Sequence, residues 1–209
     1  MIKVLYVLTK PELGGAQKHV LSLLVGLDKS RFDLNLFTAS KGYLIDRFCD
    51  IPGVHVHKSS FLKRDLSLFN DIPALFELYF YIRKNKFDVV HTHSSKAGIL
   101  GRMAAWLAGV RCVVHTVHGW SFNAYQHKFV YLAYVFLERL CARCTHVLVV
   151  VSSIERTQGV ALKIIPLGEY VLIHCGIRHE DYRHTDDQKI DLRQQLGIDP
   201  GCCVVGTVA

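Results

Sequence analysis

Short segments that combine glycine, histidine, serine and lysine follow three of the apolar runs in this sequence. In the first segment, Gly14 and Gly15 stand between an apolar run and a helical pattern. Adjacent glycines at such a turn let a ligand approach the backbone N–H groups of a helix N-terminus, which suits a phosphate or a carboxylate. A plain tight turn would have the same signature. The spacing matches neither G-x-G-x-x-G nor the P-loop motif, so standard dinucleotide and P-loop sites are disfavoured.

The second segment surrounds two serines at the start of another helical pattern. Ser94 is placed to cap that helix, and this is the simplest reason for its presence. His93 and Lys96 would add a cationic, hydrogen-bonding rim at the same place.

The third segment places His118 and Gly119 at the end of an apolar run, beside Trp120 and Phe122. A histidine in this position can present a ring nitrogen to a ligand, donate a hydrogen bond to a sugar hydroxyl, or titrate near neutral pH. A buried histidine with its hydrogen bonds satisfied inside the protein is the alternative interpretation.

Other kinds of chemistry find less support in the sequence. His91 and His93 have strand spacing and should share a face, but no third metal ligand is evident, so we expect no metal site. Cys141 and Cys144 form a C-x-x-C pair without a second pair at zinc-ribbon distance, which favours a structural role near a helix end. No pair of acidic residues marks the strand ends and no G-x-S-x-G motif occurs, which disfavours glycosidase and α/β-hydrolase chemistry.

The elements that must position these segments alternate along the chain. Apolar, β-rich runs alternate with longer helical patterns, which predicts an α/β fold with a doubly wound, Rossmann-like parallel sheet. Such sheets bind ligands beyond the C-terminal ends of their strands, and all three segments stand at such ends. The expected strands are residues 2–9, 32–39, 54–57, 88–91, 112–117, 146–151, 170–174 and 203–208. The expected helices are residues 16–27, 71–85 (with Asp71 as cap), 94–108, 128–143, 152–161 and 187–196.

Composition agrees with a folded, basic protein. The chain has 209 residues, half of them hydrophobic, and a formal net charge of +7. The basic residues are scattered, and no tract or aromatic-interleaved pattern resembles a nucleic-acid module, so we expect no nucleic-acid partner. The charge instead favours phosphate-bearing substrates or an acidic membrane face. The seven cysteines have no disulfide-framework spacing, which indicates a reducing compartment.

The hydrophobic runs bear on localisation. The N-terminal run is too short for a signal peptide. The most apolar segment, Phe129–Leu137, spans nine residues, whereas a membrane-spanning helix needs about 20. We therefore expect a cytoplasmic protein, with peripheral contact at the inner face of the cytoplasmic membrane as a further hypothesis.

Taken in order, these segments resemble the N-terminal domain of GT-B-fold glycosyltransferases of family 4, also called glycosyl transferases group 1. The resemblance runs from residue 2 to about residue 178, and its most specific part is the pair of motifs across residues 87–122. Within the family, the chain looks most like bacterial enzymes that extend polysaccharide on lipid carriers. The matching pieces are Ile-Lys-Val-Leu-Tyr-Val-Leu at 2–8, Gly-Gly-Ala-Gln-Lys-His-Val at 14–20, Phe-Asp-Leu-Asn-Leu-Phe-Thr at 32–38, Phe-Asp-Val-Val-His-Thr-His-Ser-Ser-Lys-Ala-Gly-Ile-Leu-Gly-Arg at 87–102 and Val-Val-His-Thr-Val-His-Gly-Trp-Ser-Phe at 113–122.

The resemblance implies two Rossmann-like domains that face a cleft. The N-terminal domain would chiefly hold the acceptor, and the C-terminal domain would bind the nucleotide of a nucleotide-sugar donor. The reaction implied is sugar transfer to a polysaccharide or lipid-linked acceptor, with retention of anomeric configuration and with no obligatory metal or other cofactor.

The resemblance also implies roles for single residues. Gly14, Gly15 and Gly119 would belong to the donor and substrate site, with the first two near the donor phosphates and sugar. His118 would be the catalytic residue that meets the transferred sugar. The acceptor contacts implied are Gln17, Lys18, His93 and Lys96.

The chain departs from the family near its C-terminus. Where the family often has Ile-Pro-Asn-Gly-Val-Asp, this chain has Ile-His-Cys-Gly-Ile-Arg at 173–178. A polar stretch follows, so we expect an acceptor-side domain over residues 1–178 and, over 179–209, a hinge and the start of a donor-binding domain. The run Val204–Ala209 resembles the first strand of that second domain. We therefore expect a truncated chain that lacks the donor half and is inactive alone.

Two other functions stay open. A nucleotide-sugar epimerase on the same fold would convert the donor without an acceptor. A non-catalytic half-enzyme would bind a separate partner subunit or a membrane, and the basic charge and the aromatic segment Phe129–Phe136 would suit that role.

Overall fold

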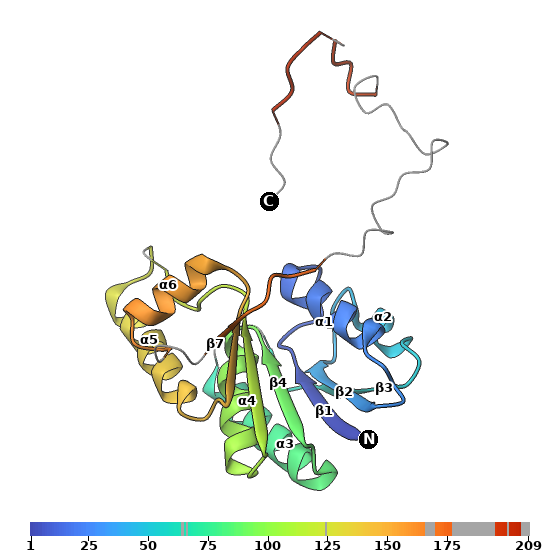
Figure 1. Cartoon of the computed structure of the whole chain (residues 1–209), viewed down its shortest axis with the longest axis vertical. Helices are drawn as coiled ribbons and strands as arrows, with labels where there is room; N and C mark the ends of the chain where they lie inside the picture. The colour runs from blue at the N-terminus through green and yellow to red at the C-terminus, as the bar shows by residue number, and fades with distance from the viewer. Residues whose placement is uncertain are drawn as a thin grey trace. The chain divides into compact units, whose positions relative to one another are not determined.

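The structure is a computed structural model that describes residues 1–63, 65, 67–123, 125–165, 170–176, 195–199 and 201–205 (Figure 1). The chain divides into two compact units, Met1–Gly176 and Ile177–Ala209, and the sheet and the site described below belong to the first. The polar stretch expected to be a hinge lies outside the described residues. Its role as a domain boundary stays a prediction.

The first unit alternates strands and helices from end to end, which confirms the predicted α/β class. Its strands are β1 (Ile2–Val7), β2 (Phe32–Ala39), β3 (Val54–Ser59), β4 (Val89–His93), β5 (Cys112–Val117), β6 (Val147–Val150) and β7 (Tyr170–Leu172). Its helices are α1 (Gly15–Gly26), α2 (Ile45–Cys49), α3 (Leu68–Asn85), α4 (Ser95–Leu107), α5 (Lys128–Ala142) and α6 (Ser153–Ala161).

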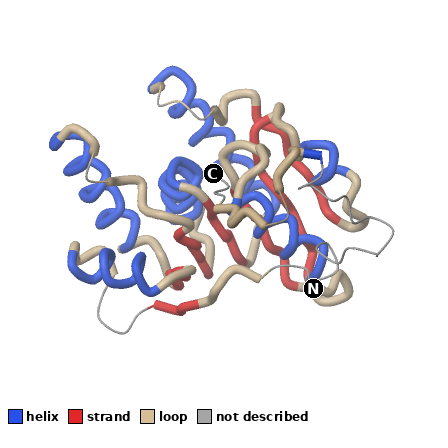
Figure 2. Tube along the Cα trace, turned by 90° about the horizontal axis from the view of Figure 1, so that it is seen from above, coloured by secondary structure: helices blue, strands red, loops and turns tan. Residues whose placement is uncertain are grey.

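The seven strands form one parallel sheet in the order β3-β2-β1-β4-β5-β6-β7. Helices pack on both sides of the strands (Figure 2). The direction of winding reverses between β1 and β4, which pair with Tyr6 opposite His91 and Val7 opposite Thr92. The connections after these two strands leave on opposite sides, and such a divergence opens a crevice at the C-terminal edge of a sheet. The segments that follow β1, β4 and β5 therefore lie side by side at this edge, as the sequence predicts.

Successive side chains along the strands point to opposite faces of the sheet, and helices cover both faces. Leu5 and Val7 of β1 pack in a buried cluster with residues of α3 and α4. Val4 and Tyr6 point to the other face and pack with residues of α1 and α2. Because a fully buried aliphatic side chain contributes about 1.5–3 kcal/mol, these two clusters hold the sheet edge and its loops in place.

Helix α3 begins at Leu68, three residues before the start that the sequence predicts. The expected cap, Asp71, therefore lies inside the first turn, and the residue at the cap position is Ser67. The Asp71 carboxylate still serves this helix end, because its Oδ2 accepts a hydrogen bond from the backbone N–H of Ser67 at 3.1 Å. The contact resembles the reciprocal half of a capping box, except that Asp71 is the fourth residue of the helix rather than the third.

Ser94 is the residue before α4, but its side chain makes no capping bond to that helix. Its backbone has φ 64°, in the left-handed region, and its Oγ lies 2.7 Å from Oγ1 of Thr9. The backbone N–H of Ala97 donates to the same Thr9 oxygen at 3.1 Å. The cap of α4 is thus supplied by Thr9, which follows β1, and the prediction that Ser94 caps the helix is wrong.

Two further differences concern short elements. Helix α2 was not expected, and it forms because Leu44 and Phe48, both fully buried, complete the cluster beneath α1. The expected strand 203–208 is absent over Cys203–Val205, and its remaining residues lie outside the described part of the chain. The expected helix 187–196 lies almost entirely outside it as well.

Candidate functional site

A cleft of about 840 Å³ lies at the C-terminal edge of the sheet, beside the reversal of strand order. This volume is in the range of small-molecule sites. One wall is polar and comes from the loop after β1, the first turn of α4 and Asp71, whereas α5 supplies an apolar wall. The lining residues are Thr9, Lys10, Glu12, Leu13, Gly14, Ala16, Gln17, Asp71, Ser94, Ser95, Lys96, Ile99, Leu100, His118, Gly119, Val130, Ala133, Tyr134 and Leu137.

The glycines of the first segment differ in position. Gly14 occupies the cap position of α1 and lines the cleft, whereas Gly15 is exposed and is not among the lining residues. Gln17 lines the cleft, and its Nε2 donates to the backbone oxygen of Lys10 at 2.9 Å, which ties the loop to the helix. Because the first N–H groups of a helix have no intrahelical partners, the start of α1 can donate hydrogen bonds to an anionic group.

Gly119 also lines the cleft, directly after His118. Its φ is +107°, a conformation that side-chain-bearing residues rarely adopt. No heavy atom would lie within 4 Å of a Cβ at this position. The glycine is therefore required by the backbone turn that presents His118, and it leaves the backbone open to a ligand.

The two lysines predicted as acceptor contacts have different surroundings. Lys96 lines the cleft but is only 9% exposed, and its Nζ forms an ion pair with the Asp71 carboxylate and donates to the backbone oxygen of Asp65. The cationic rim predicted here is thus a neutralised pair. Lys18 is exposed on α1 and is not among the residues that line the cleft. The acceptor roles of both residues stay predictions.

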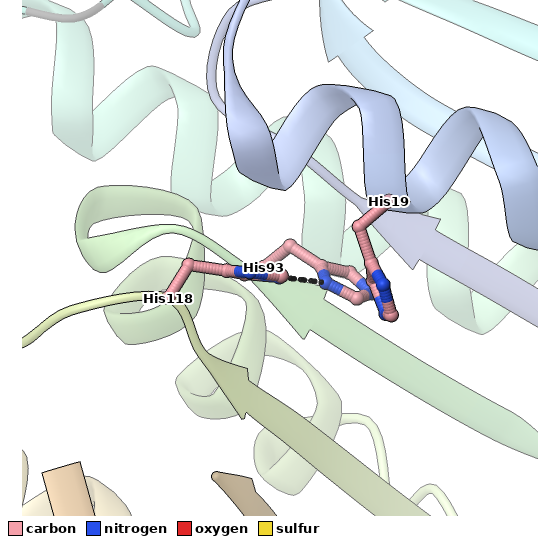
Figure 3. A group of neighbouring side chains, drawn as sticks. All are labelled: His19, His93 and His118. Atoms are coloured by element: carbon pink, nitrogen blue, oxygen red, sulfur yellow. Dashed lines mark hydrogen bonds between the residues drawn. The ribbon is translucent and has the colours of Figure 1, made fainter. Parts of the chain in front are cut away.

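Three histidines from different elements meet beneath the cleft (Figure 3). His118 follows β5 and lines the cleft, His93 ends β4 and is fully buried, and the half-buried His19 comes from α1. Nδ1 of His93 lies 3.1 Å from Nε2 of His118, so one of the two rings donates a hydrogen bond to the other. The ring centroids are 5.1 Å apart for His19 and His118, 5.7 Å for His19 and His93, and 5.4 Å for His93 and His118.

Burial keeps these rings neutral at pH 7. It lowers the pKa of His118 from 6.5 to about 4, because the charged ring would lose its hydration. The same cause lowers the pKa of His19 and holds that of the wholly buried His93 well below its ordinary value. A neutral imidazole has one N–H and one lone pair, so each ring can offer a donor and an acceptor.

His93 has an unusual environment on its far side. Its Nε2 is buried and has no hydrogen-bond partner among the described residues. The ring stacks on Tyr6 at 5.9 Å and lies 4.2 Å from the ring of His91, which confirms that the two histidines of β4 share a face. A buried polar atom without a partner costs about 1–3 kcal/mol, so this nitrogen is either tolerated at that cost or serves a ligand.

The apolar wall is held by a buried ion pair that the sequence analysis did not identify. Arg102 of α4 is fully buried and its Nη2 lies 2.7 Å from Oε2 of Glu138 in α5. Nε of Arg102 donates to the backbone oxygen of Gly98 at 2.8 Å, and Oγ of Ser121 donates to the other Glu138 oxygen at 3.2 Å. The pair thus fixes α5 against α4 and against the segment after His118. A lone glutamate inside the apolar pattern of α5 was the available signal.

His19 was also missed, for a different reason. It lies within a helical pattern, where nothing in the local sequence marks it as part of a site. Only the pairing of β1 with β4 brings α1 over the ends of β4 and β5.

The C-x-x-C pair has no sign of reactivity. Cys141 is buried in α5, and burial raises the pKa of its thiol to about 11. A thiol with so high a pKa is a poor nucleophile and metal ligand at pH 7.

Residues 14–176 match the family model described as the glycosyl transferase 4-like domain. Over 144 residues the chain is 45% identical to the UDP-Gal:alpha-D-GlcNAc-diphosphoundecaprenol alpha-1,3-galactosyltransferase of Escherichia coli, which covers 69% of this chain and 37% of that protein. It is 27% identical over 121 residues to the O-antigen biosynthesis glycosyltransferase WbnH of Escherichia coli, over 58% of this chain and 33% of that one. The chain thus spans about a third of the length of these relatives.

Solved structures agree on the fold. Sucrose-phosphate synthase from Thermosynechococcus elongatus superposes with a TM-score of 0.69 at 14% identity, over 95% of this chain and 53% of that one. Anabaena Alr3699/HepE, in complex with UDP, superposes with a TM-score of 0.67 at 18% identity, over 94% and 50%. At these identities the likeness establishes the architecture alone.

Proposed function

The chain belongs to the glycosyl transferase 4-like domain family and has the Rossmann-like fold of the N-terminal half of a GT-B enzyme, and from this premise we propose that it forms the acceptor side of a glycosyltransferase. The reaction proposed is the transfer of a sugar from a nucleotide-sugar to a lipid-linked or polysaccharide acceptor. The name of the 45% identical relative includes a nucleotide-sugar donor, UDP-Gal, and a lipid-linked acceptor, GlcNAc-diphosphoundecaprenol. We take UDP-Gal and a diphosphate-linked GlcNAc lipid as the substrates to test first.

The observation that carries the proposal is the two-sided cleft next to His118. Its polar wall offers the Gln17 amide, the Ser94 hydroxyl and the Asp71 carboxylate to sugar hydroxyl groups. Its apolar wall, with Tyr134 at the centre, suits the less polar face of a sugar ring or the first part of a lipid chain. A substrate that is itself part sugar and part lipid fits both walls.

The lowered pKa of His118 limits the roles that this residue can have in the proposed reaction. The ring is neutral at pH 7, because its pKa is lowered to about 4, so it does not begin the reaction as a general acid. Since Nε2 is engaged with His93, Nδ1 is the nitrogen left for a ligand. We assign to His118 a hydrogen bond with a sugar hydroxyl. This bond would orient the sugar and offset charge near its anomeric carbon.

Gly14 and the start of α1 are proposed to meet the donor phosphates, since backbone N–H groups at a helix N-terminus favour an anion. Retention of anomeric configuration and the lack of an obligatory metal or other cofactor are part of the proposal, and the family resemblance is their support.

Peripheral membrane contact is also part of the proposal. No helix among the described residues is long and apolar enough to cross a membrane. Aromatic side chains are nevertheless exposed on two helices, with Phe129 and Phe136 on α5 and Phe69, Phe76 and Phe80 on α3. Together with a net charge of +7, these surfaces suit the inner face of an acidic membrane, where a lipid-linked acceptor would be found.

The test is galactose transfer from UDP-Gal to a short-chain GlcNAc-diphospholipid. The enzyme is a chimera in which the residues of this chain replace the matching part of the 45% identical relative. We expect activity, and we expect His118→Ala to lower kcat/KM at least about 100-fold, the scale of losing one positioned hydrogen-bonding group. The exposed His127→Ala is the matched control and should leave kcat/KM unchanged.

Three outcomes would change the assignment. Full activity of the His118→Ala chimera would overturn the role of that residue. Conversion of the donor sugar without acceptor would indicate an epimerase. A folded but inactive chimera that does not bind the acceptor analogue would favour the non-catalytic half-enzyme.

A further inference from the structure

We propose that His19, His93 and His118 form a binding site for a divalent transition-metal ion such as Zn²⁺ or Ni²⁺. The three rings come from α1, β4 and the segment after β5, and one nitrogen of each lies within 4.8 Å of the other two. Imidazole nitrogen is a preferred ligand of Zn²⁺, Ni²⁺ and Cu²⁺, whereas Mg²⁺ and Ca²⁺ require oxygen ligands. Among the described residues this group contains histidines alone, which selects the first class of ions.

The spacing of the rings fits such an ion. A tetrahedral zinc site with Zn–N bonds of about 2.0–2.1 Å holds its ligand nitrogens about 3.3 Å apart and the centres of its imidazole rings about 5.2 Å apart. The three centroid separations are 5.1, 5.4 and 5.7 Å, and Nδ1 of His93 already lies 3.1 Å from Nε2 of His118. For closure, the hydrogen bond between His93 and His118 must open so that a lone pair of each ring faces the ion, and the half-buried ring of His19 must turn toward them.

The site would be open on one side. His118 lines the cleft, whereas His93 lies beneath it. An ion therefore has an entry path, and three protein ligands leave a coordination position that water or an anionic group from the cleft can occupy. Coordination would also redirect the ring of His118. If that ring contacts the sugar, as proposed above, the metal inhibits transfer rather than supporting it; this consequence alone rests on the proposed function.

The experiment is calorimetric titration of the 209-residue chain, prepared without an affinity tag and freed of metal by chelation. We expect one Zn²⁺ or Ni²⁺ bound per chain, no uptake of Mg²⁺, and visible absorption bands of a tetrahedral site when Co²⁺ is used. His19→Ala and His118→Ala should each weaken binding at least about tenfold, in the range seen when metal sites lose a supporting group.

Matched controls exclude other ligands. His127→Ala removes an exposed histidine away from the cluster, and Cys144→Ser removes one thiol of the C-x-x-C pair; both should bind the ion as the unmodified chain does. Near-ultraviolet circular dichroism checks that each variant is folded. Failure to bind Zn²⁺ and Ni²⁺ below about 1 mM, or equal affinity in folded His19→Ala and His118→Ala, would overturn the proposal. Neither result bears on acceptor binding or transfer by the chimera.

Discussion

Thr9 connects two parts of the chain that are far apart in sequence. Its hydroxyl oxygen lies 2.7 Å from Oγ of Ser94 and accepts the backbone N–H of Ala97 at 3.1 Å. One threonine thus joins the two segments that diverge at the reversal of strand order. The sequence predicts a cap at Ser94, because serine before a helical pattern is the usual signature. A cap supplied from a neighbouring strand has no local signature, so it could not be predicted.

We expect Thr9→Val to lower the free energy of unfolding by about 1–2 kcal/mol, because the substitution keeps the shape but leaves the Ala97 N–H without its acceptor. Urea denaturation followed by circular dichroism measures the effect. Thr9→Ser retains the hydroxyl and should cost clearly less. An unchanged midpoint for Thr9→Val would show that α4 does not depend on this cap.

The histidines illustrate what sequence reasoning can and cannot supply for single residues. His118 and Gly119 were identified because they stand at the end of a strand, and the structure adds that Gly119 has a positive φ of +107°. His93 was identified from its position but not its burial. His19 was not identified, since its partners lie on β4 and after β5 and its place among them depends on the strand order.

At the scale of elements, the contact between α4 and α5 holds the helix that forms the apolar wall of the cleft. The apolar wall belongs to α5, and the buried pair Arg102–Glu138 attaches that helix to α4. A buried charge that loses its partner is far more costly than the pair is favourable.

Glu138→Gln should therefore lower the free energy of unfolding by about 3–5 kcal/mol, since it leaves the guanidinium of the fully buried Arg102 without a counter-charge. The double variant Arg102→Met with Glu138→Leu should recover much of this loss, because it removes both charges together. Thermal and urea unfolding of the unmodified chain, the single variant and the double variant measures these changes in the free energy of unfolding. Equal losses for the single and the double variant would contradict a coupled pair.

Element prediction succeeded where the signal is long and local. Strands β2 and β5 have the predicted bounds, and β1, β3, β4 and β6 differ from them only at their ends. The errors fall where tertiary contacts decide. Helix α2 is too short to show a period and depends on the burial of Phe48, and α3 begins earlier than its proline-containing pattern indicates, because Ser67 and Asp71 form the cap together.

At the scale of the whole molecule, buried histidines make stability depend on pH. Burial lowers the pKa of His91 from 6.5 to about 3 and holds those of His93 and His115 well below 6.5. The unfolded chain binds these protons near pH 6.5, whereas the folded chain binds them only at much lower pH. The unfolded state is thus favoured as the pH falls below 6.5.

We expect the free energy of unfolding to be steady above pH 6.5 and to fall below it by about 1.4 kcal/mol per pH unit for each such histidine. Urea titrations at pH 7, 6 and 5 measure the slope. His91→Gln should reduce this slope by about 1.4 kcal/mol per pH unit, the contribution of one proton. The exposed His127→Gln should leave the slope unchanged. A slope that is the same in all three proteins would mean that His91 takes up a proton in the folded state.

The proposed membrane contact also concerns the whole molecule. We expect the chain to co-sediment with vesicles that contain anionic lipid and to do so weakly with zwitterionic ones, because exposed aromatic side chains and a net charge of +7 act together. Phe129→Ser with Phe136→Ser should reduce the bound fraction several-fold. Leu13→Ser removes an exposed apolar side chain at the cleft rather than on that surface, leaves the net charge unchanged, and is the control. Equal partition onto both kinds of vesicle, or none, would contradict the hypothesis.

Helix α5 presents two sets of side chains on neighbouring faces. Val130, Ala133, Tyr134 and Leu137 line the cleft, and Phe129, Leu132 and Phe136 are exposed. Val130 belongs to both sets, since it is also 44% exposed, whereas Phe129, Leu132 and Phe136 do not line the cleft. If the cleft holds the acceptor and the exposed side chains meet a membrane, as we propose, substitutions at Phe129, Leu132 or Phe136 would alter where the protein resides and leave the choice of acceptor unchanged. Helix α5 would then be a place where two heritable traits can diverge one at a time, in nature or in directed evolution.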